Sequence, residues 1–140
     1  MLHRQNGGVL EPAYDGLLPL IAALAARDDV VLGVVTGKSR RGLDAILAHH
    51  GLTKAFFTTR TADDCPSKPH PAMVLECCTE AGIDPNQTTV IGDAVYDMQM
   101  AVSAGARAVG VSWGYGPVDA LKAAGAHHVV SHADEIATLI

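Results

Sequence analysis

Short, nearly continuous apolar runs alternate along the chain with segments whose apolar residues recur at helical spacing. Such runs are typical of strands buried on both faces, and we expect strands at residues 30–36, 55–59, 90–91, 108–113 and 129–130. The helical spacing predicts helices at about 16–27, 40–49, 72–81, from 95 onward, 118–124 and 133–140. Strands and helices that alternate in this way indicate an α/β fold with a doubly wound parallel sheet.

A length of 140 residues suits one domain and is large enough for a single hydrophobic core. Residues 1–14 are polar and contain glycine, so we expect an irregular N-terminal arm followed by a core domain over residues 15–140. Hydrophobic residues make up 49% of the chain and aromatic residues only 4%, so the core is expected to be aliphatic.

Charge and cysteine content narrow the class of protein. The net charge is -5 and no run of Lys or Arg occurs, which argues against a nucleic-acid surface. The chain contains no stretch of about 18 apolar residues, so we expect no membrane span. Residues 1–8 lack the apolar core of a signal peptide. Cys65, Cys77 and Cys78 have no metal-ligand spacing and are odd in number, so we expect reduced thiols in a cytoplasmic protein.

Two carboxylates follow the apolar run at residues 90–91. Asp93 lies at the carboxyl end of the expected strand, and Asp97 lies in the first turn of the helix that follows. In parallel α/β folds this crevice is where ligands bind, and two hard oxygen ligands suit Mg²⁺. The alternative is that Asp93 only caps the helix and Asp97 only stabilises its amino end.

Thr36 ends the strand expected at residues 30–36, directly before a helix. A hydroxyl beside backbone N–H groups at a helix amino terminus can form an anion pocket, although an ordinary helix cap would also explain Thr36 or Ser39. A P-loop is excluded, because it needs four residues between its glycines whereas Gly33 and Gly37 enclose three.

Lys68 lies in a loop stiffened by neighbouring prolines. Lysine can serve phosphate as a point charge, but a lone lysine is more often a solvated surface residue. Taken together, a threonine, a lysine and two aspartates follow successive expected elements in an order that occurs in a known family.

Residues 34–39, 67–71 and 90–97 resemble the second, third and fourth motifs of the haloacid-dehalogenase-like (HAD) hydrolases. Within that superfamily the likeness is strongest to phosphoglycolate phosphatases, and residues 111–116 and 124–130 strengthen it. The resemblance extends over about residues 12–140 and implies a HAD-like Rossmannoid core.

The resemblance also implies a role for each candidate residue. Thr36 and Gly37 would hold the phosphoryl group of a phosphorylated small molecule, Lys68 would neutralise it, and Asp93 with Asp97 would hold Mg²⁺. Thr36, Lys68 and Asp93 would thus be catalytic. In this family the reaction proceeds through an aspartyl-phosphate.

The family's first motif, an apolar strand ending in Asp-x-Asp-Gly-Thr, does not occur in the chain, and neither does the cap domain. Asp15-Gly16 is a superficial echo that would place the nucleophile at Ala13. Because loss of a nucleophile costs on the order of 10⁶ in turnover, we expect a truncated core that is inactive as this chain alone. The alternatives are a non-catalytic binding or assembly module that dimerises through an incomplete sheet, and a longer enzyme whose nucleophile lies upstream.

The missing strand is the central one of the family's sheet. About five buried aliphatic side chains at about 2 kcal/mol each amount to about 10 kcal/mol, which rivals the whole stability of a domain, about 5–15 kcal/mol. The strands ending at Thr36 and Asp93 could pair directly, residues 1–10 could enter the gap, or a homodimer or other partner could donate a strand. Val9 and Leu10 offer little apolar surface, so we expect direct pairing or dimerisation.

Overall fold

A computed structural model describes residues 17–114 and 116–140 of the chain. The expected arm at residues 1–14 lies outside the described residues. Helices and strands alternate as the sequence predicts. Their order is α1 (Leu17–Ala25), β1 (Gly33–Val35), α2 (Arg40–His49), β2 (Thr58–Arg60), α3 (Ala72–Ala81), the 3-10 helix η1 (Pro85–Gln87), β3 (Thr89–Gly92), α4 (Val95–Ala104), β4 (Arg107–Val111), α5 (Val118–Ala123), β5 (His128–Val130) and α6 (Ala133–Ala137).

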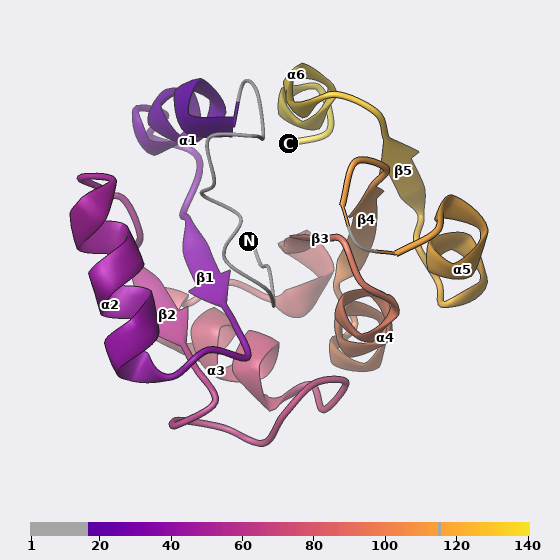
Figure 1. Cartoon of the computed structure of the whole chain (residues 1–140), viewed down its shortest axis with the longest axis horizontal. Coiled ribbons are helices and arrows are strands. Elements are labelled where there is room, and N and C mark those ends of the chain that lie inside the picture. The colour runs from indigo at the N-terminus through magenta and orange to yellow at the C-terminus, as the bar shows by residue number, and fades with distance from the viewer. Residues whose placement is uncertain (1–16, 115) are drawn as a thin grey trace.

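All strand pairs in the described chain are parallel, and they form two groups (Figure 1). β1 pairs with β2, and β3, β4 and β5 pair in that order. The register aligns Val34 with Thr59 in the first group and Ile91 with Val109 in the second. The fold is therefore an α/β domain of parallel strands, with a sheet that is divided between β1 and β3.

The expected direct pairing of β1 with β3 is wrong for the described residues. The two groups of strands are joined by side-chain packing instead, because each core cluster takes residues from both groups. Val34 of β1 and Ile91 of β3 belong to one cluster, and Val35 of β1 and Val90 of β3 belong to the other.

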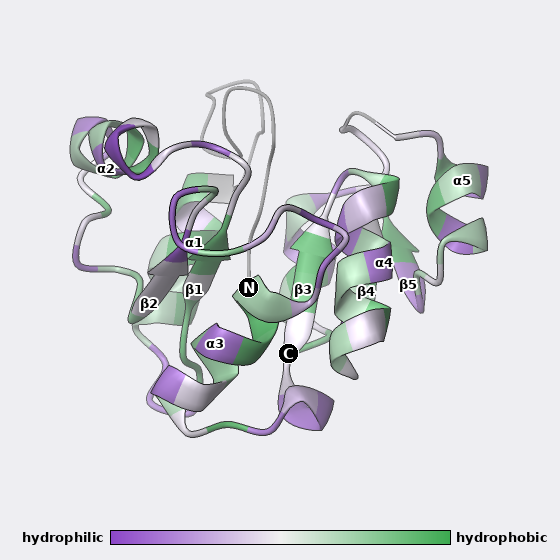
Figure 2. Ribbon diagram, turned by 90° about the horizontal axis from the view of Figure 1, so that it is seen from below, coloured by the Kyte–Doolittle hydropathy of each residue, from purple (hydrophilic) through white to green (hydrophobic). Residues whose placement is uncertain are grey.

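Alternate residues of the strands enter two cores, one on each face of the sheet. The first core contains side chains of α1, α2 and α6, and the second contains side chains of α3, α4 and α5. This period of two follows from the pleat of a strand, and burial on both faces explains the nearly continuous apolar runs. Figure 2 shows β1 and β3 as predominantly apolar between the helices. The doubly wound arrangement is confirmed.

Several predicted boundaries need correction. β2 begins at Thr58 rather than at residue 55, and Phe57 is 61% exposed. The run at residues 30–36 is not buried throughout, since Val31 is 45% exposed. The last helix ends at Ala137 rather than at residue 140. No helix of the described chain has both the length and the apolar character needed to cross a membrane.

Candidate functional site

The four predicted site residues follow strands or precede and begin helices, at the carboxyl-end edge of the divided sheet. Thr36 follows β1, Asp93 follows β3, Asp97 lies in the first turn of α4, and Lys68 lies in the loop before α3. Thr36, Asp93 and Asp97 are buried, with 2%, 4% and 0% of their surface exposed. Because carboxyl ends of parallel strands form one edge, this is the crevice where α/β folds bind ligands.

Lys68 and Asp97 form a buried ion pair. The Lys68 Nζ donates to the Asp97 Oδ1 at 2.7 Å, and the two side chains are 2% and 0% exposed. The interpretation of Lys68 as a solvated surface residue is therefore wrong. Their contact joins the predicted third and fourth motifs, and the two residues lie 29 positions apart in the chain.

Asp97, rather than Asp93, accepts the hydrogen bond at the amino end of α4. The N-cap residue is Ala94, whose backbone N–H donates to the Asp97 Oδ2 at 3.1 Å. The interpretation of Asp93 as the helix cap is therefore wrong. Both carboxylate oxygens of Asp97 accept from protein donors, so this side chain is fixed in place by Lys68 and by the backbone.

Burial shifts the proton affinity of both members of the ion pair. Desolvation lowers the pKa of Lys68 to about 8, against the attraction of Asp97 and Asp93, which raises it. Desolvation raises the pKa of Asp97, although the charge and hydrogen bond of Lys68 act in the opposite direction. A lysine with a pKa of about 8 is still mainly a cation at pH 7, and can neutralise an anion there.

Thr36 and Ser39 have separate hydrogen-bonding roles before α2. Ser39 is the N-cap, and its Oγ accepts from the N–H of Gly42 at 3.0 Å. The Oγ1 of Thr36 accepts from the N–H of Lys38 at 3.1 Å. An ordinary cap therefore explains Ser39 but not Thr36. Gly37 is exposed between them, and an added Cβ would meet nothing within 4 Å, so side-chain crowding does not require glycine there.

The donor set suits half of a magnesium site. Within residues 17–114 and 116–140, no group of three or more His, Cys, Asp and Glu residues could hold a metal ion. Asp93 and Asp97 are two buried carboxylates near one strand end. Mg²⁺ usually keeps several waters and takes one or two carboxylates together with phosphate oxygens. These two residues therefore fit Mg²⁺ better than a metal that needs a complete protein cage.

Sequence reasoning missed the glycines that surround the two aspartates. A Cβ on Gly92 would lie 2.5 Å from the Asp97 Cβ, and a Cβ on Gly114 would lie 2.2 Å from the Asp93 Cβ. The glycine-rich stretch after β4 was visible in the sequence, but its contact with Asp93 depends on the packing of β4 beside β3.

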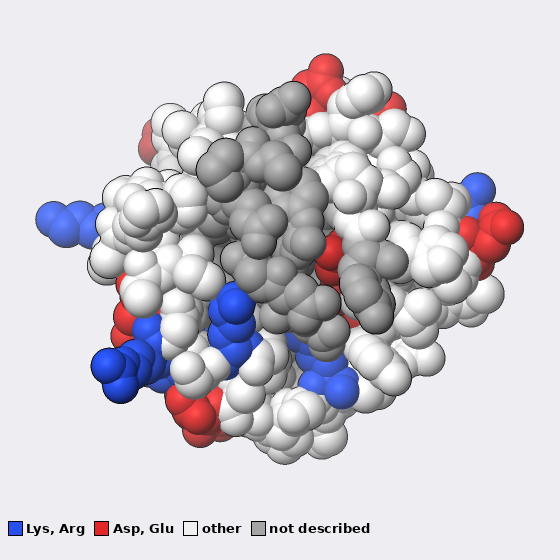
Figure 3. Space-filling model, viewed as in Figure 1, with Lys and Arg blue, Asp and Glu red and all other residues white. Residues whose placement is uncertain are grey.

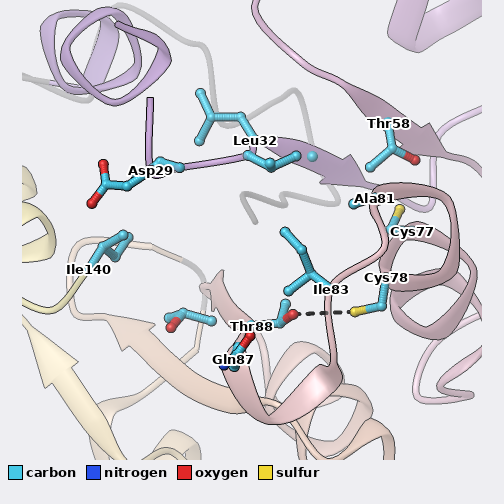
Figure 4. Close-up of a pocket in the computed structure, with 14 residues that line it drawn as sticks. Asp29, Leu32, Thr58, Cys77, Cys78, Ala81, Ile83, Gln87, Thr88 and Ile140 are labelled. Carbon is cyan, nitrogen blue, oxygen red and sulfur yellow. Dashed lines mark hydrogen bonds between the residues drawn. The ribbon is translucent and has the colours of Figure 1, made fainter. Parts of the chain in front are cut away.

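A cavity in the described part of the chain lies away from these residues. It has a volume of about 130 Å³ and is lined by residues 30–33 before and within β1 and by Thr88 and Thr89 at the start of β3 (Figure 4). In it the Cys78 Sγ lies 3.3 Å from the Thr88 Oγ1. This cavity is at the amino ends of the strands, opposite the edge that carries Asp93, and so is not the candidate site.

Basic side chains are interspersed with acidic ones on the face shown in Figure 3. Arg40, for example, lies 3.8 Å from the Asp44 carboxylate and 2.6 Å from that of Asp64. The positive charge over α2 is therefore partly neutralised within the protein.

The parallel α/β architecture, with a threonine, a lysine and two aspartates after its strands, defines a Rossmann-like domain with a candidate phosphate and metal site. The sequence profile of the haloacid dehalogenase-like hydrolases matches residues 5–111, and the chain belongs to that family. The resemblance seen in the sequence is thereby confirmed.

Two of the relatives that the chain matches are named as phosphatases. The chain is 32% identical over 136 residues to N-acetylmuramic acid 6-phosphate phosphatase of Pseudomonas aeruginosa, covering 96% of this chain and 60% of the relative. It is 36% identical over 86 residues to phosphoglycolate phosphatase of Haemophilus influenzae, covering 61% of this chain and 38% of the relative. The core is thus similar to phosphatases of this family.

A solved structure has the same fold over most of the chain. The crystal structure of a predicted phosphoglycolate phosphatase from Haemophilus somnus superposes with a TM-score of 0.82 at 28% identity, over 90% of this chain and 56% of that one. The match therefore covers 60% of the Pseudomonas aeruginosa relative, 56% of the Haemophilus somnus protein and 38% of the Haemophilus influenzae relative.

Proposed function

We propose that this chain is the phosphate- and Mg²⁺-binding part of a HAD-type phosphomonoesterase. The observation that carries the proposal is the buried ion pair of Lys68 and Asp97, 2.7 Å apart beside the carboxyl end of β3. A buried lysine is costly unless it is paired. Lys68 is paired with Asp97 and is also attracted by Asp93, and a buried cation at this strand end supports a role in anion binding that a surface lysine would not have.

Each candidate residue has a distinct task in this proposal. The hydroxyl of Thr36 and the backbone N–H of Gly37 hold the phosphoryl oxygens, and the Lys68 ammonium neutralises their charge. Asp93 and Asp97 hold Mg²⁺, and Asp97 also orients Lys68. Phosphatases of this superfamily are generally Mg²⁺-dependent. When bound, the ion would supply charge stabilisation to the phosphoryl group.

We further propose that the chain alone has no appreciable phosphatase activity, since its sequence contains no Asp-x-Asp-Gly-Thr strand. Loss of a nucleophile costs on the order of 10⁶ in turnover. The relatives named above suggest a phosphorylated small molecule as the ligand. Three free, buried cysteines support a reducing compartment such as the cytoplasm.

The test is Mg²⁺-dependent release of phosphate from p-nitrophenyl phosphate by the purified chain. We expect a rate indistinguishable from that of the Asp93→Asn variant. Robust turnover by the wild type that Asp93→Asn abolishes would refute the inactivity and would require a nucleophile elsewhere in this chain.

A second candidate function is a non-catalytic assembly module. The observation that favours it is the absence of pairing between β1 and β3 in the described chain, because strand edges can recruit a further strand. A homodimer or a strand-donating partner would satisfy these edges. Size-exclusion chromatography with light scattering tests it: a stable dimer supports this function, and a monomer at all concentrations contradicts self-association.

A further inference from the structure

The loop that follows β4 lies against Asp93. The backbone N–H of Gly116 donates to the carbonyl oxygen of Asp93 at 2.7 Å. An added Cβ on Gly114 would lie 2.2 Å from the Cβ of Asp93 and 2.7 Å from its Oδ2. Gly114 therefore lies against the Asp93 side chain, and Gly116 is hydrogen-bonded to the Asp93 backbone.

A side chain at position 114 cannot be accommodated without a shift of its surroundings. Non-bonded carbon atoms prefer separations of about 3.5–4.0 Å, so a methyl group at 2.2 Å would force Asp93 or the loop to move. Asp93 is only 4% exposed and has little room to shift. Glycine at 114 thus allows the loop to close on the carboxylate.

Helix α5 supports the loop from the protein side. Leu121 is completely buried, and its Cδ2 lies 3.1 Å from the place a Cβ on Gly116 would occupy. The same Cβ would lie 2.8 Å from the carbonyl oxygen of Asp93. Gly116 is therefore enclosed between Leu121 and the Asp93 backbone. This enclosure holds Gly116 close to the end of β3.

We propose that Gly114 and Gly116 are positioning residues that set the orientation of the Asp93 carboxylate for Mg²⁺, with Leu121 as their support. The link to Mg²⁺ rests on the proposed function, whereas the effect on Asp93 itself does not. Residues that orient a metal ligand typically change metal affinity by about 10–100-fold when replaced.

The test compares Gly114→Ala with Gly82→Ala by calorimetric titration of Mg²⁺. Gly82 follows α3 with φ +69 and has no atom within 4 Å of an added Cβ, so its replacement introduces backbone strain remote from Asp93. We expect Gly114→Ala to weaken Mg²⁺ binding by about 10-fold or more. We expect Gly82→Ala to lower the melting temperature but to keep the wild-type affinity. Equal Mg²⁺ affinities of Gly114→Ala and the wild type would overturn the proposal.

A second measurement needs no metal. NMR reports amide exchange at Gly116 and the Asp93 carboxyl ¹³C shift, and we expect Gly114→Ala, but not Gly82→Ala, to change both. If the wild type binds no Mg²⁺, the metal site fails, and unchanged NMR signals in Gly114→Ala would separately overturn the positioning role. If Gly114→Ala does not fold, Leu121→Val replaces it: faster Gly116 exchange and a changed Asp93 signal support the proposal, and wild-type values overturn it.

Discussion

At the scale of single residues, the ion pair of Lys68 with Asp97 dominates the electrostatics of the candidate site. Desolvation works against both charges, as the lowered pKa of Lys68 and the raised pKa of Asp97 indicate. A buried pair of this kind adds little net stability, but removal of one partner leaves an uncompensated charge. Net stability therefore does not explain the pair, which is consistent with the proposed ligand-binding role.

Replacement of Lys68 by Met should destabilise the fold by about 3–5 kcal/mol, because Asp97 would remain buried without its cation. Urea unfolding without Mg²⁺ measures the loss, with Lys54→Met as the control, since Lys54 is exposed. Protonation of Asp97 should recover part of the stability of Lys68→Met at lower pH. A variant as stable as the wild type at pH 7 would contradict the buried charge pair.

At the scale of elements, the sequence predicts helices better than strand ends. The bounds of α2 and α3 match the prediction, because Ser39 caps the first and Gly82 ends the second with φ 69. The sequence does not indicate that β2 starts at Thr58, because Phe56 and Phe57 are equally apolar. Only tertiary packing decides that Phe56 is 8% and Phe57 61% exposed.

Local sequence patterns predict the approximate position of the candidate site. They do not predict its long-range contacts, so the predicted site is incomplete. Thr36, Asp93 and Asp97 each follow a recognisable strand, so their approximate position could be inferred from the chain. The contact of Asp97 with Lys68 spans 29 residues, and that of Gly114 with Asp93 requires β4 to lie beside β3. Neither depends on a pattern within one element.

Arg40, the first residue of α2, ties that helix to the end of β2. Its guanidinium donates to the Thr59 Oγ1 at 2.5 Å, to the Thr59 carbonyl at 3.1 Å and to the Asp64 carboxylate at 2.6 Å. Lysine cannot reproduce this planar set of donors. Arg40→Lys should cost about 1 kcal/mol, an amount that allows for a side chain 35% exposed.

Urea unfolding of Arg40→Lys, beside Arg41→Lys, measures this cost. Arg41 is the exposed neighbour on the same helix, so its replacement by Lys should leave the free energy of unfolding unchanged. Equal stabilities of the two variants would show that the Arg40 contacts contribute nothing specific.

Glu135 stabilises the start of α6 in a manner that depends on pH. The N–H groups of His132 and Ser131 donate to its carboxylate, at 3.0 and 2.6 Å, and these hydrogen bonds lower the pKa of Glu135 below 4.5. A group with a lowered folded-state pKa contributes stability above its unfolded pKa and loses it as the pH falls through the folded value.

The melting temperature of Glu135→Gln should therefore be lower than that of the wild type at pH 7, and the difference should shrink as the pH falls below 4.5. Asp134→Asn, an exposed replacement on the same helix, is the control. A difference that stays constant from neutral to acid pH would contradict the role of the ionised carboxylate.

At the scale of the whole molecule, two groups of parallel strands share two cores. The group of β1 and β2 is not paired with the group of β3, β4 and β5 within the described residues. Both groups contribute side chains to each core. This common packing brings the end of β1, with Thr36, and the end of β3, with Asp93, to one edge. The proposed binding site is therefore a property of the assembled domain.

The most direct test of this account is an NMR-monitored titration of the chain with Mg²⁺, beside Asp93→Asn and the exposed control Asp134→Asn. The account predicts saturable binding at millimolar Mg²⁺ or below, with shifted amide signals at Gly37, Lys68 and Asp93. Asp134→Asn should bind as the wild type does, and Asp93→Asn should not bind. No saturable binding at millimolar Mg²⁺, or unchanged binding by Asp93→Asn, would contradict it.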